Sequence, residues 1–342
     1  MAISNVQTGA QPASATSQSS PLVMRIIGAV ALAHLINDLI QSVLPSIYPM
    51  LKANYGLSFT QVGLITLTFQ LTASLLQPWV GYHTDRHPKP WLLPAGTVCT
   101  LIGILMMSVV GTFPLILLAA GLIGIGSSTF HPEASRVARL ASGGRFGLAQ
   151  STFQVGGNAG SAFGPLLAAA IIIPFGQGHV AWFGLFAVFA LFVLYRISRW
   201  YANHLSLFKL KQGQAATHGL SKNRVISALV VLGLLVFSKY FYMSSLTSYF
   251  TFYLIEKFDL SVASSQLHLF LFLGAVAAGT FFGGPIGDKI GRKAVIWFSI
   301  LGVAPFTLIL PHVDPFWTSI LSAVIGFILA SAFSAIVVHA QE

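Results

Sequence analysis

The chain has 342 residues, of which 55% are hydrophobic and only 8% are charged, and its mean hydropathy is +0.79. Soluble domains average about a quarter charged residues, so this composition indicates an integral membrane protein. The net charge of +10 does not indicate a nucleic-acid partner, because Lys and Arg occur in short clusters between apolar runs. A single cysteine, Cys99, excludes an intrachain disulfide and a cysteine metal cluster.

Apolar runs long enough to cross a bilayer, at about twenty residues each, follow one another along the chain. Residues 1–20 are polar, small and uncharged, and predict a disordered cytoplasmic tail. The polar stretch 202–222 predicts a cytoplasmic linker between an N-terminal bundle, 21–201, and a C-terminal bundle, 223–342. The ten predicted membrane spans are 24–50, 59–82, 91–111, 114–138, 146–173, 179–201, 224–254, 262–286, 294–311 and 315–339.

The distribution of positive charge predicts the orientation of these spans. Of the 18 Lys and Arg residues, 15 lie near the start of the first span, or in the alternate gaps that follow the even-numbered spans and at the span ends that flank these gaps. Positive residues accumulate in cytoplasmic loops, so we expect a multi-pass protein with its N-terminus in the cytoplasm.

One short pattern occurs twice, 203 positions apart, in the gaps after the second and eighth spans. Its members are Gly81, Asp85, Arg86 and Lys89 in the first copy and Gly284, Asp288, Lys289 and Arg292 in the second. The glycine permits close helix packing, and such a loop could latch a gate or only enforce topology. Other residues repeat at the same offset, so we expect a duplicated bundle whose second copy is truncated to four helices of six.

These features together resemble the major facilitator superfamily of secondary transporters, whose all-α fold has two pseudo-symmetric six-helix bundles. The fifth span carries Gly157, Gly160, Gly164 and Pro165, which resemble the motif of the antiporter branch. The runs 153–168, 238–243, 284–293 and 302–311 are similar to the fosmidomycin resistance family of drug exporters. The resemblance implies a bacterial inner-membrane protein that uses protons to export a small anionic phosphonate.

Carboxylates inside the predicted spans are the candidates for proton coupling. Of the eight Asp and Glu residues, six lie in loops, at span edges or at the chain end, which leaves Asp38 and Glu133. Carboxylates inside a membrane are costly and usually functional. Asp38 could instead be hydrogen-bonded permanently between spans, and Glu133 could form an intrahelical salt bridge with Arg136.

Other polar side chains inside the spans are candidates for substrate binding. Lys239 is the deepest cation, and it could bind an anion or serve as a counter-ion for Asp38. Histidines and amides at such positions could also be structural hydrogen-bonding groups that join helices. The full set of candidates is His34, Gln41, Gln70, His131, Arg136, Gln154, Asn158, Lys239, Tyr240, Tyr242 and His268.

We predict a monomeric, proton-coupled antiporter that exports a small anionic antibiotic or related xenobiotic by alternating access. Uptake symport of a metabolite needs the same buried charges but not the glycine pattern of the fifth span. A receptor built on a transporter scaffold is a third alternative. The sequence has no nucleotide-binding loop, zinc signature or nucleophile motif, so we expect no enzymatic activity, cofactor or metal.

Overall fold

All regular secondary structure is helical in the residues described by a computed structural model of the chain, 22–211, 222–332 and 336. Within these residues, nine helical segments are long and apolar enough to cross a membrane, and a shorter apolar helix, Pro315–Ser331, follows them. The predicted tenth span begins with this helix and continues beyond the described residues. The all-α membrane fold expected from the sequence is therefore confirmed.

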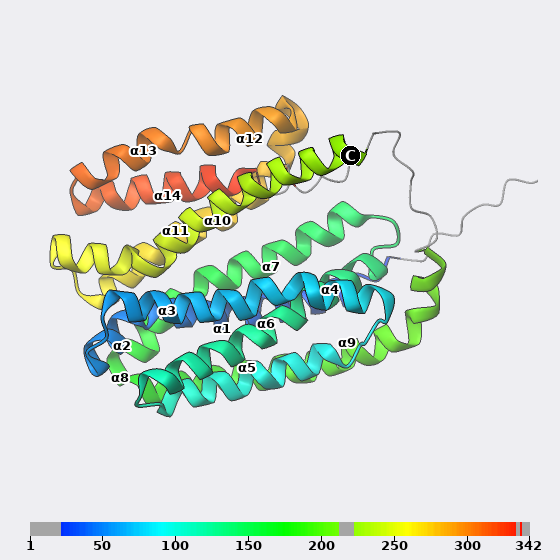
Figure 1. Cartoon of the computed structure of the whole chain (residues 1–342), viewed down its shortest axis with the longest axis horizontal. Helices are drawn as coiled ribbons and strands as arrows, with labels where there is room; N and C mark the ends of the chain where they lie inside the picture. Colours follow the sequence, from blue (N-terminus) through cyan, green and yellow to red (C-terminus); the bar gives the residue numbers. More distant parts are fainter. Residues whose placement is uncertain (1–21, 212–221, 333–335, 337–342) are drawn as a thin grey trace, which may run out of the picture.

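Successive spans alternate in direction along one long axis (Figure 1). The first part of the chain, residues 22–211, is called the N-terminal half here. It contains α1 (Met24–Ser46), α2 (Tyr48–Tyr55), α3 (Phe59–Gln70), the π-helical turn η1 (Leu71–Leu75), α4 (Leu76–Arg86), α5 (Leu92–Val109), α6 (Phe113–Ala141), α7 (Phe146–Leu167), the π-helical turn η2 (Ala168–Ile172), α8 (Ile173–Phe175), the 3-10 helix η3 (Gln177–Trp182) and α9 (Phe183–Lys211).

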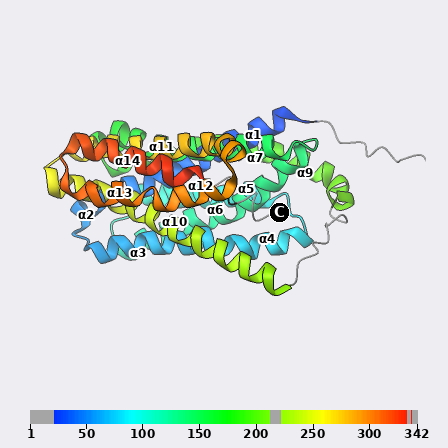
Figure 2. The ribbon, with the colours of Figure 1, turned by 90° about the horizontal axis from the view of Figure 1, so that it is seen from above.

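The C-terminal half consists of the described residues from 222 onward. It contains α10 (Lys222–Phe258), α11 (Val262–Ile290), α12 (Arg292–Leu301), α13 (Ala304–Ile309), the 3-10 helix η4 (Leu310–His312) and α14 (Pro315–Ser331). Figure 2 shows the helices of both halves running along the same long axis.

Local sequence signals explain where several helices begin and end. Ser58 and Gln61 form a capping box at the start of α3, with hydrogen bonds of 3.2 and 2.9 Å between side chain and backbone. Gly56 ends α2 in the left-handed conformation at φ 60°, which glycine adopts without steric cost. The carboxylate of Asp314 accepts the amide hydrogen of Trp317 and caps α14.

The two halves contact each other near the end of the molecule that carries α2 and α8, and they separate toward the end where α4 terminates (Figure 1). At the contacting end, Gln266 donates to the carbonyl oxygen of Ser46 at 2.7 Å. The hydroxyls of Thr66 and Ser248 lie 3.3 Å apart there. Helices α4 and α9 end, and α10 begins, at the opposite, separated end, which the sequence analysis predicts to be cytoplasmic (Figure 1).

Helix α1 packs along α7 through the glycines of the predicted antiporter-type motif. A methyl group at Gly157 would overlap the His34 ring, and one at Gly160 would overlap the carbonyl of Leu35. A Cβ at Gly164 would lie 2.8 Å from the Cβ of Ser42. Small residues allow helix backbones to approach closely in membranes, so this pattern brings α7 directly over the polar face of α1.

Pro165 lies inside α7, and η2 begins three residues later. The π-helical turn η1 interrupts the predicted span 59–82, and η2 interrupts the predicted span 146–173. The sequence analysis did not predict either turn. A shift from i→i+4 to i→i+5 hydrogen bonding changes neither hydrophobicity nor length enough to be recognised from sequence.

Candidate functional site

A cavity of about 850 Å³ lies between the two halves. This volume is in the range of small-molecule sites, about 300–1,000 Å³. Helices α1, α6, α7 and α10 and the α3–η1 segment place most of the predicted binding residues on its wall. Those that line it are His34, Gln41, Gln70, His131, Gln154, Asn158, Lys239 and Tyr240, and the proton-coupling candidate Asp38 lines it as well.

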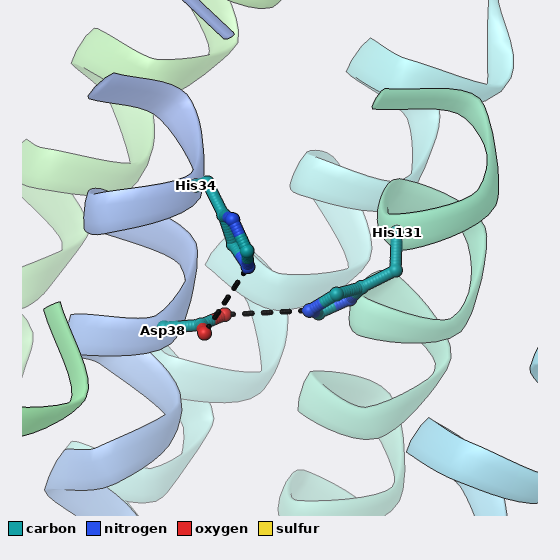
Figure 3. A group of neighbouring side chains, drawn as sticks. All are labelled: His34, Asp38 and His131. Atoms are coloured by element: carbon teal, nitrogen blue, oxygen red, sulfur yellow. Dashed lines mark ion pairs between the residues drawn. The ribbon is translucent and has the colours of Figure 1, made fainter. Parts of the chain in front are cut away.

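Asp38 is the centre of a cluster that joins α1 to α6 (Figure 3). Its carboxylate oxygens lie 3.2 Å from Nε2 of His34 and 3.5 Å from Nε2 of His131. His34 precedes Asp38 by four residues on α1, so helical geometry places both side chains on one face. His131 reaches them from α6, which brings together three residues of the predicted site.

Amide and hydroxyl groups surround the same carboxylate. Asn37 and Gln41 donate to Oδ1 of Asp38 at 3.0 and 3.3 Å. Gln41 in turn accepts a hydrogen bond from the Ser127 hydroxyl at 3.0 Å. The hydroxyl of Ser127 thus links α6 to the cluster on α1.

Lys239 faces the cavity from the C-terminal half and is largely buried. Its ammonium group donates to the hydroxyl of Ser299 at 2.9 Å. Among the side chains that the structure describes, no ion pair joins Lys239 to Asp38. The predicted anion contact and the Asp38 cluster therefore stand on different halves of the molecule.

Glu133 and Arg136 form a second charged cluster, outside the cavity lining. Arg136 donates to Glu133 at 2.6 Å, to the hydroxyl of Thr84 at 3.1 Å, and to Asp85. This is the intrahelical salt bridge that the sequence analysis gave as the alternative role of Glu133. Arg136 also connects it to Asp85 in the first copy of the repeated pattern. Oε2 of Glu133 and the Tyr201 hydroxyl are buried without a hydrogen-bond partner among the described residues.

Two other predicted binding residues do not line the cavity. Tyr242 shares a 2.8 Å hydrogen bond with the hydroxyl of Thr307. Nδ1 of His268 donates to the carbonyl of Ser264 at 2.8 Å, which matches the structural alternative considered for this histidine.

In the first loop motif, Gly81 and Lys89 are half-buried and Arg86 stacks over the Tyr82 ring at 4.1 Å. In the second, Lys289 is exposed. The backbone of Gly284, Asp288 and Arg292 belongs to α11 and α12, but the side chains of Asp288 and Arg292 lie outside the described part of the structure.

The sequence analysis did not predict the residues that line the cavity with hydroxyl groups. These are Ser42, Tyr48, Thr66, Ser74, Ser127, Ser161, Ser244, Thr247, Ser248 and Thr280. Ser and Thr are frequent in membrane helices, where they often bond to their own backbone, so their positions alone indicate little. Ser127 could have been recognised from the sequence, because it lies one helical turn before the predicted binding residue His131 and therefore on the same face of the helix.

A bundle of antiparallel membrane helices around a central cavity, with charged and polar groups set in its wall, is typical of a membrane transporter. Residues 30–342 match the Major Facilitator Superfamily, and the chain belongs to that superfamily. It is 58% identical over 342 residues to the fosmidomycin resistance protein of Escherichia coli (strain K12), covering 100% of this chain and 84% of the relative. It is 40% identical over 324 residues to an uncharacterized MFS-type transporter, YfnC, of Bacillus subtilis (strain 168), covering 94% of this chain and 79% of the relative.

Solved structures share the fold at low sequence identity. A bacterial homolog of the human lysosomal transporter Spinster, inward-facing and occupied, aligns with a TM-score of 0.68 at 16% identity, over 92% of this chain and 74% of that one. A D-xylose-proton symporter aligns with a TM-score of 0.67 at 15% identity, over 92% of this chain and 82% of that one.

Proposed function

We propose that this protein is a proton-coupled antiporter that exports a small anionic antibiotic or related xenobiotic, in the class of phosphonates such as fosmidomycin. The observation that carries the proposal is the separation of charged groups across one cavity. Asp38, with His34 and His131, belongs to the N-terminal half, while Lys239 belongs to the C-terminal half. The N-terminal half would therefore hold the proton, and the C-terminal half would mainly hold the anion.

Asp38 is the first candidate for the proton carrier, because it lies in the cavity wall next to two groups that can exchange protons. Glu133 is the second candidate, since it is fully buried and belongs to the neighbouring charged cluster. Lys239 is the proposed anion contact, with the amides of Gln154 and Asn158 facing the same cavity. In a low-dielectric cavity, changing the charge of one group shifts the free energy of ions bound nearby.

The relative in Escherichia coli, the fosmidomycin resistance protein, supports the substrate class. Its match extends over all 342 residues of this chain. We also propose that the protein acts as a monomer in the bacterial inner membrane, with a cytoplasmic N-terminus. Under this orientation, the separated end of the two halves faces the cytoplasm. Alternating access would then proceed by rocking of the N-terminal and C-terminal bundles predicted from the sequence.

Drug-driven proton movement in vesicles that contain the purified full chain tests this function. Asp38→Asn should abolish proton movement driven by a fosmidomycin gradient, because an amide cannot carry the proton. Glu256→Gln is the matched control, since it neutralises an exposed carboxylate outside the cavity lining and should leave coupling intact.

Unchanged coupling in Asp38→Asn would remove this residue from the proton path and direct the same assay to Glu133→Gln. Reversing the proton gradient separates export from uptake, since an antiporter and a symporter move substrate in opposite directions under one gradient. Substrate binding without any proton movement in the parent protein would exclude the proposed coupling.

A further inference from the structure

We propose that His34, Asp38 and His131 form a binding site for a divalent transition-metal ion of the zinc class. The inference goes beyond the proposed transport function, which requires no metal. One ligand atom from each of the three residues can be chosen so that all lie within 4.8 Å of one another. Two imidazoles with one carboxylate form a ligand set of open zinc sites, in which a water or substrate oxygen takes the fourth position.

The orientation of the imidazole rings is the first argument (Figure 3). Nδ1 of His34 lies 2.8 Å from the carbonyl oxygen of Phe153, and Nδ1 of His131 lies 3.0 Å from that of Ser127. A carbonyl only accepts, and the Ser127 hydroxyl, 3.3 Å from Nδ1 of His131, donates to Gln41. These contacts assign the hydrogen to each Nδ1, and in a neutral ring Nε2 then presents its lone pair. Histidines that bind metals are commonly anchored in this way through their other ring nitrogen.

Both Nε2 atoms face Asp38, whose carboxylate oxygens are also electron-pair donors. Three donors that converge on one point repel one another unless a cation lies between them. Protonated imidazoles would meet this need, and so would one metal ion in contact with all three side chains. The metal alternative makes specific demands on spacing and access.

The spacing meets those demands. Zinc binds nitrogen and oxygen at about 2.0–2.2 Å, which places neighbouring ligands of a tetrahedral site roughly 3.3 Å apart. Oδ2 of Asp38 lies 3.2 Å from Nε2 of His34, Oδ1 of Asp38 lies 3.5 Å from Nε2 of His131, and one ligand atom from each of the three residues lies within 4.8 Å of the others. Small side-chain movements would therefore suffice to close the three ligands around an ion.

An ion can reach the cluster from the central cavity, whose wall includes all three side chains. The side chains of Asp38 and His131 are 18% and 26% exposed, whereas that of His34 is 2% exposed. His34 is held by packing as well: its ring stacks on Phe153 with centroids 4.0 Å apart. One fixed ligand and two accessible ones leave the open coordination position on the cavity side.

The test is direct metal binding to the purified full chain in detergent after treatment with a chelator. We expect one zinc ion per chain in equilibrium dialysis, and cobalt in the same site should give the visible absorption of a four-coordinate ion. Asp38→Asn and His131→Gln should each weaken zinc binding by more than about 100-fold, because even outer-shell changes cost about 10–100-fold.

His268→Gln is the matched control, and it should bind zinc like the parent protein. His268 is also half-buried, and its Nδ1 also bonds the carbonyl four residues earlier, but it does not belong to the Asp38 cluster. Size-exclusion elution and thermal unfolding establish which variants are folded. If only one of the two ligand variants folds, that variant decides the result.

Absence of saturable zinc binding by the parent protein would overturn the inference, and so would unweakened binding in a folded ligand variant. The result is independent of proton coupling. If zinc binds as expected while Asp38→Asn leaves proton movement intact, the metal site stands and the proposed role of Asp38 in coupling fails. If coupling requires Asp38 but no zinc binds, the proposed role of Asp38 in coupling stands and the metal site fails.

Discussion

At the residue scale, the charged pair of Glu133 and Arg136 has a structural part that can be measured apart from transport. Glu133 has no exposed surface, and Arg136 bonds it at 2.6 Å. Removing one partner of a buried ion pair leaves an uncompensated charge, which typically costs about 3–5 kcal/mol. Replacing both partners with neutral residues removes the charge and its counter-charge together.

We therefore expect Arg136→Gln to lower the free energy of unfolding by about 3–5 kcal/mol, and Glu133→Gln/Arg136→Gln to recover most of this loss. Thermal unfolding of the purified variants in one detergent measures the difference. A double variant as unstable as Arg136→Gln alone would show that the bonds of Arg136 to Thr84 and Asp85, rather than charge compensation, account for the stabilisation.

Lys239 is the residue whose loss should affect anion binding most directly. A hydrogen bond to a charged group contributes about 1.5–3 kcal/mol, so Lys239→Gln should weaken binding of an anionic phosphonate about tenfold or more. Equilibrium binding of radiolabelled substrate to the purified protein provides the measurement.

Ser299→Ala is the control for this prediction, because it removes the hydrogen-bond partner of Lys239 but keeps the ammonium group. Its effect on phosphonate affinity should be smaller than that of Lys239→Gln. Equal affinities of Lys239→Gln and the parent protein would show that the substrate is held elsewhere in the cavity.

At the element scale, the contact between α1 and α7 determines how closely the Asp38 cluster can assemble. Gly160 lies against the Leu35 carbonyl, and Gly157 against the His34 ring and Asp38. A Cβ at Gly157 would stand 2.7 Å from Oδ2 of Asp38. The glycines that resemble an antiporter motif therefore have a physical role in this structure, which is to allow α7 to cover the two polar residues of α1.

Gly160→Ala should destabilise the protein by about 1–3 kcal/mol, since an added methyl group in a packed contact forces backbone shifts. Gly28→Ala is the control: it lies on α1 with no atom within 4 Å of an added Cβ, so stability should be equal or higher. Thermal unfolding compares the two variants. Equal stability of both would mean that the α1–α7 contact can relax without cost.

At the scale of the whole molecule, the two halves approach each other near one end. Thr66 and Ser248 belong to different halves, and their hydroxyls lie 3.3 Å apart. Because Cys99 is the only cysteine in the chain, Cys99→Ser provides a background for a designed disulfide. Thr66→Cys/Ser248→Cys in this background should cross-link under oxidation and stop transport.

Addition of a reductant should restore transport in the double-cysteine protein, and each single-cysteine variant should transport under both conditions. Gel mobility after protease cleavage in the linker 202–222 reports the cross-link, and substrate flux in vesicles reports activity. Full transport by the completely cross-linked protein would contradict alternating access by movement of the two halves at this contact.

The sequence predicted the helical architecture well, because bilayer thickness and loop charge are properties of contiguous segments. It also placed His34 and Asp38 on one face of α1, since their spacing is that of a helical turn. The association of His131 with this pair depends on how α6 packs against α1, and the bond from Lys239 to Ser299 joins residues 60 positions apart. Neither follows from the local pattern of residues, because both are set by tertiary packing.

Under the proposed export function, the cavity also suggests how a small molecule could block transport. Its wall combines Asp38 from one half with Lys239 from the other, across a volume of about 850 Å³. A rigid zwitterionic compound that binds Asp38 and Lys239 at once would hold the two halves at a fixed separation. Under the alternating-access proposal, such an inhibitor would oppose the relative movement of the two halves. A rigid compound would bind more tightly than a flexible one, because it loses less conformational entropy on binding.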